Sequence, residues 1–232
     1  MPHPIHRTAD GTDTLYHPAY GQTYHSHHGA LAEARHVFLE ATGVADRLAR
    51  CTSAAVLEVG FGTGLNALLT AQAALQHGTP LTFVSLEREV LPATTLAALN
   101  HGAILDAQPL ADALAAWRAS LPDPVPVGRY ACDLAPSIAL HLLVGDAASA
   151  VLPSDAFDAV YLDAFSPDAN PGLWTAPFLA GLCTSLRPGG WLATYSAKGS
   201  VRRTLQAVGF VVEKRPGPPG KREMLVGVKP PG

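Results

Sequence analysis

Short apolar runs alternate along the chain with longer segments in which apolar residues recur every three or four positions. The runs have the length and composition of buried strands and cover residues 55–59, 81–86, 138–144, 157–163 and 191–196. Helical spacing marks the segments between them, among them 65–72, 91–100, 110–121 and 201–208. This alternation predicts an α/β fold with a mostly parallel sheet, whose ligands bind beyond the carboxyl ends of the strands.

The two ends of the chain depart from this alternation. Residues 210–214 and 224–228 predict two strands, joined by a segment rich in proline and glycine that is short enough for an antiparallel hairpin. An amphipathic helix over 29–43 precedes the first strand. Residues 1–28 are polar and hold six of the ten histidines, so we expect a flexible lead-in there and one folded domain over 29–232.

Three alternating glycines, Gly60, Gly62 and Gly64, follow the first strand and precede the helix at Leu65. Glycine lets the backbone take positive φ and approach a ligand closely, and the helix directs free N–H groups toward it. The third glycine comes one residue too early for the dinucleotide pattern, which favours a cofactor without a pyrophosphate. Glu58 would repel a phosphate but suits a cationic ligand such as S-adenosylmethionine. The alternative is a plain strand-to-helix turn.

Two further acids follow predicted strands. Glu87 ends the second strand about 20 residues beyond the glycine turn, where an acid can accept hydrogen bonds from ribose hydroxyls, although acids at strand ends are common on surfaces. Asp146 follows the third strand, and with Ala147 it is placed to meet the adenine ring. The alternative for Asp146 is a helix N-cap.

The segment after the fourth strand is the candidate reaction site. The first and fourth strands flank the topological switch point of a sheet of this kind, where ligands bind. We therefore expect Asp163, Phe165, Ser166 and Pro167 to line the place where the cofactor meets the substrate.

Charge and cysteine content narrow the class of protein. The net charge is −3, but eight of the sixteen basic residues lie from Lys198 onward, where only two acids oppose them. A polyanionic substrate and a merely solvated surface both fit this basic end. Three scattered cysteines predict neither a disulfide framework nor a zinc site, and the histidines lack metal-ligand spacing. We therefore expect no metal and a location in the reducing cytoplasm. No apolar stretch has transmembrane length, so we also expect a soluble protein with no membrane partner.

The glycine turn, the acids after the first three strands and the terminal hairpin together resemble the class I S-adenosylmethionine-dependent methyltransferases over residues 50–228. This resemblance implies a Rossmann-like, seven-stranded, mostly parallel sheet whose last strand is antiparallel. It also implies that residues 29–232 form the methyltransferase domain.

A closer resemblance covers nearly the whole chain. It is to the methyltransferase domain of the bacterial tRNA 5-methylaminomethyl-2-thiouridine biosynthesis proteins of the MnmC type, and five blocks carry it: YHSHHGALAEARHVFL (24–39), EVGFGTGLN (58–66), LDAFSPDANPGLW (162–174), TYSAKGSVR (194–202) and PGPPGKREM (216–224). The resemblance implies methylation of the amine of 5-aminomethyl-(2-thio)uridine at the wobble position. Bifunctional members continue into a flavin-dependent oxidase, whereas this sequence ends at Gly232, so we expect the stand-alone, MnmD-type form without FAD.

The resemblance also implies partners and residue roles. We expect the tRNA anticodon loop as partner and functional coupling to the enzyme that makes the aminomethyl precursor. The cofactor-binding residues would be Glu58, Gly60, Phe61, Gly62, Gly64, Asn66, Glu87, Asp146 and Ala147. Tyr24 is expected among the substrate-binding residues, and from the sequence it could cover the cofactor pocket or pack at the start of the helix. Phe165 and Tyr195 would stack on a flipped-out base, and the phosphates would be met by Lys198, Arg202, Arg203, Lys221 and Arg222.

Asp163 is the candidate catalytic residue. An alkylamine with a pKa of about 10 is mostly protonated at neutral pH and then has no lone pair to attack a methyl group. Asp163 could accept the proton while the amine is held in line with the sulfonium. The alternative is a carboxylate that binds only the amino group of the cofactor.

Two other functions compete with this hypothesis. A small-molecule N- or O-methyltransferase fits the acidic net charge and predicts equal use of a free nucleoside. A non-catalytic module that binds S-adenosylmethionine or tRNA predicts binding without turnover. Binding that weakens steeply as salt rises would favour tRNA.

Overall fold

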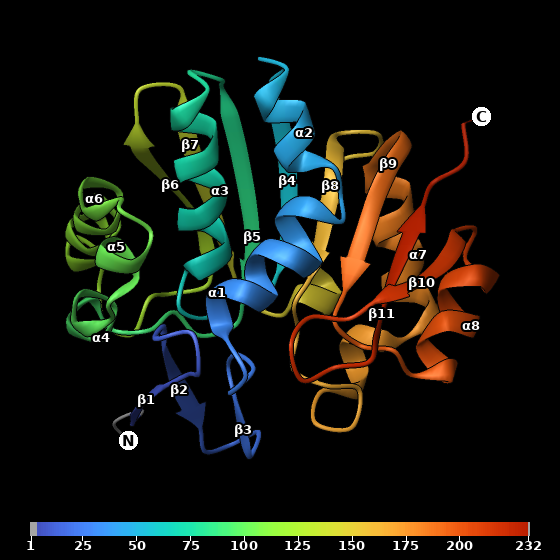
Figure 1. Ribbon diagram of the computed structural model, residues 1–232, viewed down its shortest axis with the longest axis horizontal. Helices are drawn as coiled ribbons and strands as arrows, with labels where there is room; N and C mark the ends of the chain where they lie inside the picture. The colour runs from blue at the N-terminus through green and yellow to red at the C-terminus, as the bar shows by residue number, and fades with distance from the viewer. Residues whose placement is uncertain (1–3, 232) are drawn as a thin grey trace.

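A computed structural model describes residues 4–231, and Figure 1 shows an α/β protein built around one large sheet. The strands are β1 (Ile5–Arg7), β2 (Asp13–His17), β3 (Gln22–Thr23), β4 (Ala54–Val59), β5 (Leu81–Glu87), β6 (Gly128–Ala135), β7 (Ile138–Val144), β8 (Phe157–Leu162), β9 (Leu186–Thr194), β10 (Val211–Pro216) and β11 (Glu223–Val228). The helices are α1 (Ala30–Glu33), the π-helical η1 (Ala34–Glu40), α2 (Val44–Ala49), α3 (Leu65–Gln76), α4 (Ala93–Ala98), α5 (His101–Ile104), α6 (Gln108–Ala119), the 3-10 turns η2 (Ala147–Ser149) and η3 (Pro171–Trp174), α7 (Ala176–Ser185) and α8 (Gly199–Ala207). His3 lies outside the described residues.

The large sheet has the strand order β10-β11-β9-β8-β4-β5-β7-β6. The five strands from β9 to β7 in that order are parallel, whereas the last strand, β11, is antiparallel to both of its neighbours. The predicted α/β class, the mostly parallel sheet and the antiparallel last strand are confirmed. The chain adds strands on one side of β4 and then on the other, so the switch point lies between β4 and β8, as expected.

The sheet has eight strands where seven were expected, because residues 128–135 form β6, antiparallel to β7 at the sheet edge. Residues 121–127, just before this strand, form no helix or strand. Cys132 and Leu134 are buried and Asp133 between them is exposed, which is the period-two pattern of a half-buried strand. Three prolines at 122, 124 and 126 precede β6 and hid this short pattern in the sequence.

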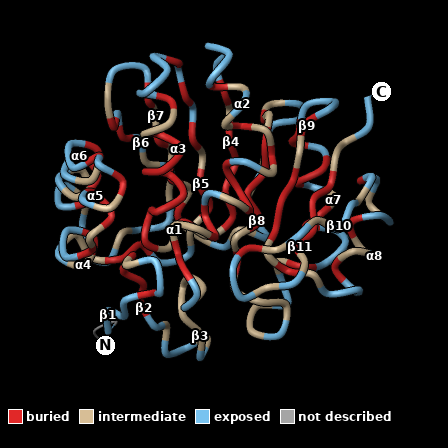
Figure 2. Tube along the Cα trace, in the orientation of Figure 1, coloured by how far each residue is buried: buried red, intermediate tan, exposed pale blue. Residues whose placement is uncertain are grey.

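Helices cover both faces of the sheet, and Figure 2 shows the buried residues concentrated in the strands and on the inner sides of the helices. Val56 and Phe83 pack on the face covered by η1, α3 and α6. Their neighbours Leu57 and Val84 belong to the cluster under α7 and α8 on the other face. This alternation within a strand buries both faces of the sheet and fixes the positions of the strand ends.

Residues 5–23 contain a three-stranded antiparallel sheet, β1-β2-β3, next to the carboxyl ends of the parallel strands (Figure 1). Asp13 joins it to the body of the protein: its N–H donates to Asn100 Oδ1 at 2.8 Å, and its Oδ2 accepts from the Asn100 N–H at 3.0 Å. Leu15 is fully buried. The expected flexible lead-in therefore contains strands that the sequence analysis did not predict, and its mobility and the 1–28 boundary stay predictions.

Two expected helices differ from those observed. The helix over 29–43 is present as α1 followed by the π-helical η1, which ends at Glu40, and Gly43, with a φ of 74°, is the N-cap of α2. The helix expected from Ala147 is only the three-residue turn η2, and its cap Ala150 is already extended. Pro153 disfavours helical geometry at the residue before it, which explains why the helix does not continue. No helix among residues 4–231 is both long and apolar enough to cross a bilayer.

Candidate active site

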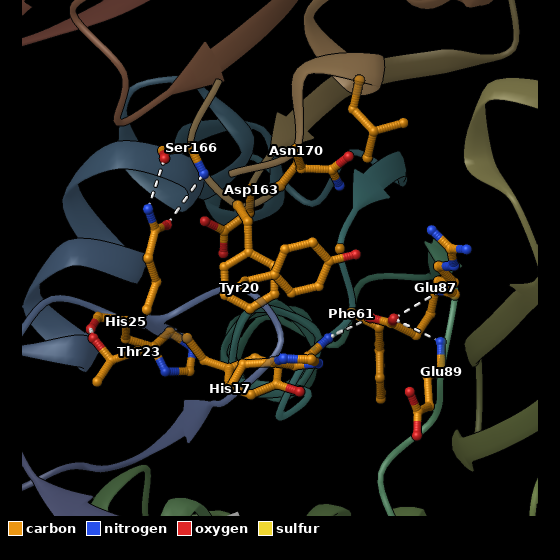
Figure 3. Close-up of a pocket in the computed structure, with 18 of the residues that line it drawn as sticks. His17, Tyr20, Thr23, His25, Phe61, Glu87, Glu89, Asp163, Ser166 and Asn170 are labelled. Carbon is orange, nitrogen blue, oxygen red and sulfur yellow. Dashed lines mark hydrogen bonds between the residues drawn. The ribbon is translucent and has the colours of Figure 1, made fainter. Parts of the chain in front are cut away.

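A cavity of about 770 Å³ lies at the carboxyl ends of β4, β5, β7 and β8 and is closed on one side by the N-terminal sheet (Figure 3). This volume is in the usual range for small-ligand pockets. Its wall combines segments that are far apart in the sequence: 16–27, 60–62, 86–89, 145–147 and 163–166. The cavity is therefore at the predicted switch point.

The glycine turn has the backbone geometry that the sequence predicts. Gly60, Gly62 and Gly64 have φ values of 95°, 51° and 78°. A Cβ on Gly60 would lie 2.9 Å from the Asp163 carbonyl oxygen, and a Cβ on Gly62 would lie 2.8 Å from the Tyr24 ring. Any side chain at these two positions would strain the backbone and clash with Asp163 or Tyr24 in the cavity wall. Tyr24 covers the turn and lines the cavity. Of its two expected roles, covering the cofactor pocket is therefore favoured over packing at the start of the helix.

Glu58 lies behind the turn and does not line the cavity. It is fully buried, its Oε2 accepts from Ser85 Oγ at 2.6 Å, and its Oε1 has no hydrogen bond among the described residues. Burial raises the pKa of Glu58 to about 8. Direct contact between Glu58 and a cationic cofactor group stays a prediction.

Glu87 lines the cavity, with its carboxylate held by backbone N–H groups (Figure 3). Its Oε2 accepts from Gly62 N at 2.9 Å, and its Oε1 accepts from Arg88 N at 2.7 Å and Glu89 N at 3.0 Å. Burial raises the pKa of Glu87, and these hydrogen bonds counteract the rise. The carboxylate thus has a fixed orientation next to the glycine turn, which supports the expected ribose contact.

Asp146 and Ala147 also line the cavity. Asp146 caps η2, because its Oδ1 accepts from Ala148 N at 3.1 Å. The N-cap alternative is therefore confirmed. A carboxylate has about four acceptor positions, so the adenine contact is compatible with the cap and stays a prediction.

Asp163 lies in the cavity wall, and Asn66 fixes its carboxylate: Asn66 Nδ2 donates to Asp163 Oδ2 at 2.8 Å. Burial raises the pKa of Asp163 well above its ordinary value, and the negative charges of Glu33 and Glu58 raise it further. The Asn66 hydrogen bond and the Lys221 ammonium lower it. The net effect is a carboxylate with an increased proton affinity at the place where the sequence predicts the reaction.

An aromatic cluster adjoins Asp163. The Phe165 ring stacks on Tyr20 with centroids 4.3 Å apart, and the rings of His17 and Tyr24 each lie 5.3 Å from it at steeper angles. All four residues line the cavity. Because Tyr20 covers one face of Phe165, base stacking on Phe165 stays a prediction with Tyr20 as a further candidate.

The aromatic cluster is held in place by a polar contact between the N-terminal sheet and the loop after β8. Gln22 Nε2 donates to Ser166 Oγ at 2.8 Å, and Ser166 N donates to Gln22 Oε1 at 3.4 Å. Ser166 thus lines the cavity as expected, and its side chain is oriented by the N-terminal sheet.

Tyr195 and Lys221 are in the cavity wall together. Tyr195 donates its hydroxyl hydrogen to Ala164 O at 2.8 Å, and the Lys221 Nζ lies 4.0 Å from the centre of its ring. Lys221 also forms an ion pair with Glu33. Lys221 is therefore inside the cavity and engaged, whereas the sequence analysis expected it at a phosphate.

The other predicted residues lie outside the cavity wall. They are Gly64, Asn66, Pro167, Lys198, Arg202, Arg203 and Arg222, together with Glu58. Lys198 forms an ion pair with Asp168 at the surface. The contacts of the four cations with phosphates stay predictions.

The sequence analysis missed His17, Tyr20, Gln22 and Glu33 as cavity residues. The first three lie in the polar segment that was expected to be flexible, where no hydrophobic pattern indicates a position. Glu33 lies within the block 24–39 that carries the resemblance, so a signal was present, but it was assigned to the polar side of an amphipathic helix.

The chemistry of the wall fits S-adenosylmethionine. The turn at Gly60 and Gly62 leaves room that a side chain would fill, and Glu87 presents an oriented carboxylate beside it. Within residues 4–231, no group of three or more histidine, cysteine or acidic side chains could hold a metal ion.

Comparison with known proteins gives the family. The sequence model of a family described as S-adenosyl-L-methionine-dependent methyltransferase matches residues 109–230, just over half of the chain. The chain belongs to this methyltransferase family. The prediction of a methyltransferase that uses S-adenosylmethionine is thereby confirmed.

Similar proteins agree with the closer resemblance. The tRNA 5-methylaminomethyl-2-thiouridine biosynthesis bifunctional protein MnmC of Burkholderia thailandensis is 39% identical over 222 residues, which cover 92% of this chain and 33% of that protein. The protein of the same name from Cupriavidus necator is 42% identical over 218 residues, covering 91% and 32%. The chain therefore spans about a third of the length of the curated relatives it matches.

Among solved structures, MNMC2 from Aquifex aeolicus superposes with a TM-score of 0.76 at 27% identity, covering all of this chain and 72% of that one. Spermidine synthase from Thermotoga maritima has a TM-score of 0.51 at 14% identity, covering 97% and 71%, and shows a common fold alone. The predicted resemblance to MnmC-type methyltransferases is confirmed.

Proposed function

We propose that the chain methylates the amine of 5-aminomethyl-(2-thio)uridine at the wobble position of tRNA, giving 5-methylaminomethyl-(2-thio)uridine. The observation that carries the proposal is the Asp163 carboxylate, half-buried in the cavity wall beside the glycine turn with a strongly raised pKa. It occurs in a chain about 40% identical to proteins named for biosynthesis of that base.

In this proposal Asp163 accepts the proton of the substrate. S-adenosylmethionine supplies, when bound, a methyl group on a cationic sulfur. An alkylamine with a pKa of about 10 must lose a proton before its nitrogen can attack. The raised pKa of Asp163 narrows the difference in proton affinity between the two groups, so the transfer costs less free energy. Asn66 holds the carboxylate in one orientation for this step.

The partner in this proposal is the anticodon loop of tRNA. The four cations outside the cavity, Lys198, Arg202, Arg203 and Arg222, would contact phosphates, and their binding would weaken as salt rises. The methyl transfer needs neither FAD nor a metal. The step that releases the amine from its precursor would occur at another active site, and we expect functional coupling to it. The three cysteines are free, which suits a cytoplasmic location.

A second candidate, a methyltransferase for small amines, is favoured by the acids around Asp163. Glu33 adds negative charge there, and a small cationic amine needs no basic surface. This candidate predicts that a free amine or nucleoside is methylated as fast as tRNA and with little dependence on salt.

The test is transfer of labelled methyl to two tRNA preparations. One carries 5-aminomethyluridine at the wobble position, and the other carries the unmodified or the carboxymethylaminomethyl base. We expect label only in the first, and loss of that label with the Asp163→Asn variant. Label in neither preparation, with cofactor binding intact, would contradict the proposed substrate and lead to a screen of small amines.

A further inference from the structure

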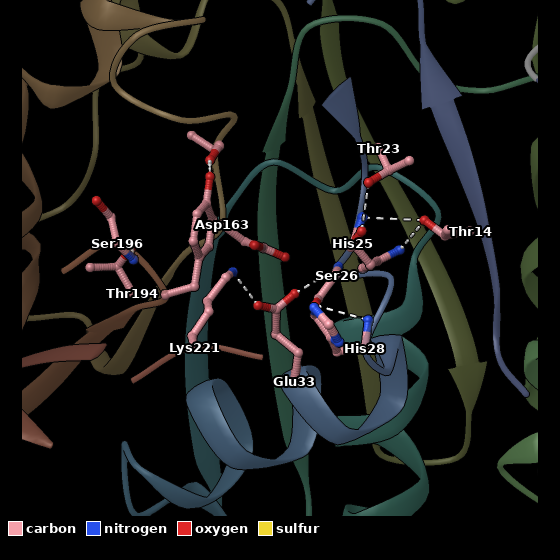
Figure 4. A network of polar contacts seen from close by, with 12 residues as sticks. Thr14, Thr23, His25, Ser26, His28, Glu33, Asp163, Thr194, Ser196 and Lys221 are labelled. Carbon is pink, nitrogen blue, oxygen red and sulfur yellow. Dashed lines mark hydrogen bonds and ion pairs between the residues drawn. The ribbon is translucent and has the colours of Figure 1, made fainter. Parts of the chain in front are cut away.

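Lys221 places an alkylammonium group inside the cavity. Its Nζ lies 4.0 Å from the centre of the Tyr195 ring and forms an ion pair with Glu33 (Figure 4). The side chains of Lys221 and Glu33 are 31% and 7% exposed, whereas those of Lys198 and Asp168 in a surface pair are 41% and 82% exposed. The Lys221 ammonium is thus held between a carboxylate and a ring face on a half-buried side chain.

The carboxylate and the ring are fixed by contacts of their own. Glu33 Oε2 accepts from Ser26 N at 3.0 Å, and Glu33 comes from the buried helix α1. The Tyr195 hydroxyl donates to Ala164 O at 2.8 Å. Lys221 instead comes from the connection between β10 and β11, at a turn where its N–H donates to Pro218 O. The receiving groups therefore persist when Lys221 leaves.

This end of the cavity has more acceptors than donors. Asp163 lies beside the Lys221–Glu33 pair (Figure 4) and interacts electrostatically with both residues. Two carboxylates, Asp163 and Glu33, thus lie beside one ammonium group in the cavity wall. This excess of carboxylates favours an occupant that brings positive charge and N–H donors.

We propose that Glu33 and the face of Tyr195 form a subsite for an alkylammonium group, which Lys221 fills in the free protein and the substrate amine fills in the complex. Carboxylates and aromatic faces are the groups that bind ammonium ions. The inference rests on the proposed function, because an aminomethyl group is an alkylammonium at neutral pH. Displacement also frees Lys221 for the phosphate contact that the sequence analysis expected of it.

The test removes the internal ammonium and offers an external one. Lys221→Met keeps the aliphatic stem, and ethylammonium is titrated into the protein by calorimetry and by the rise in melting temperature. An internal occupant multiplies the apparent affinity by the fraction of time that the site is empty. If Lys221 fills the site at least nine-tenths of the time, the variant binds ethylammonium at least about tenfold more tightly than the wild type, and this is the result that we expect. The matched control is Lys214→Met, which breaks the Lys214–Glu223 pair of the same hairpin outside the cavity.

Two further measurements distinguish a subsite for ammonium groups from an ion pair that has only a structural role. Adding Glu33→Gln to Lys221→Met should abolish the gain, and neutral acetamide should not bind. A variant that folds only with ethylammonium present would also support the subsite. A Lys221→Met protein that ethylammonium neither binds more tightly nor stabilises would overturn it. The test uses neither tRNA nor methyl transfer, so its outcome is independent of the wobble substrate.

Discussion

Two carboxylates in the cavity wall, Glu87 and Asp163, are held in opposite ways. Glu87 accepts hydrogen bonds from three backbone N–H groups, which favour the charged form. Asp163 accepts from one side-chain amide and is surrounded by further acids, which favour the protonated form. Both are half-buried in the cavity wall, so their partners distinguish them.

This difference matches the two tasks of a methyltransferase. A cofactor with neutral hydroxyl groups needs an acceptor that stays charged and fixed, and backbone N–H groups of the glycine turn provide one. A substrate that must lose a proton needs an acceptor that can be protonated near neutral pH. Single substitutions can disturb these two environments one at a time.

Asp163→Asn should have the largest effect. The amide keeps the shape and the hydrogen bond but cannot accept the proton, so we expect kcat to fall by about 10²- to 10⁴-fold. Binding of the demethylated cofactor should change less than kcat, because the glycine turn and the Glu87 carboxylate that it holds stay in place. Single-turnover methylation and cofactor titration measure the two quantities. A variant with normal kcat would remove Asp163 from the chemistry.

Glu87→Gln should weaken cofactor binding more than catalysis. Loss of a charged acceptor costs roughly 1.5–3 kcal/mol per hydrogen bond, so we expect the cofactor Kd to rise about 10- to 100-fold. At saturating cofactor, kcat should recover most of its value. Glu40→Gln, an exposed acid on η1 away from the cavity, is the matched control. Unchanged cofactor affinity in Glu87→Gln would leave this carboxylate a purely structural role beside the glycine turn.

The residues of the cavity wall that lie at the strand ends could be predicted from the sequence, because local patterns mark them. Gly60, Gly62, Glu87 and Asp163 follow buried strands whose hydrophobic runs are plain, and parallel strands bring their ends together. The sheet was predicted for the same reason, except β6, whose half-exposed edge has a weak pattern.

The other side of the cavity could not be predicted in this way. Tyr20 and Gln22 lie in a short polar segment, and their positions depend on contacts with Phe165 and Ser166 more than 140 residues later. Lys221 is one of several cations in a basic region, and only the fold shows that it turns inward to Glu33. Long-range contacts of polar side chains leave no periodic signal in a sequence.

Glu58→Gln tests whether Glu58, an acid near Asp163, is protonated in the folded protein. Because the pKa of Glu58 is about 8 in the folded protein and about 4.5 in the unfolded chain, the folded state binds more protons between these values. Its contribution to stability is therefore present at low pH and is lost as pH rises toward 8. The free energy of unfolding of Glu58→Gln relative to wild type should increase by on the order of 2 kcal/mol between pH 5.5 and pH 7. Urea unfolding at both pH values measures this. A difference independent of pH would show that Glu58 stays charged.

Asn66→Leu should have the smallest effect and the most specific one. The Asn66 hydrogen bond lowers the pKa of Asp163, so its loss raises that pKa and a larger fraction of Asp163 is protonated at neutral pH. Since only the deprotonated carboxylate accepts the substrate proton, the acid side of the kcat/KM profile should move to higher pH. We expect activity at pH 7 to fall about 3- to 10-fold and to recover at alkaline pH. Thr70→Val, one turn further along α3, is the matched control. A uniform loss at every pH would mean that Asn66 only shapes the wall.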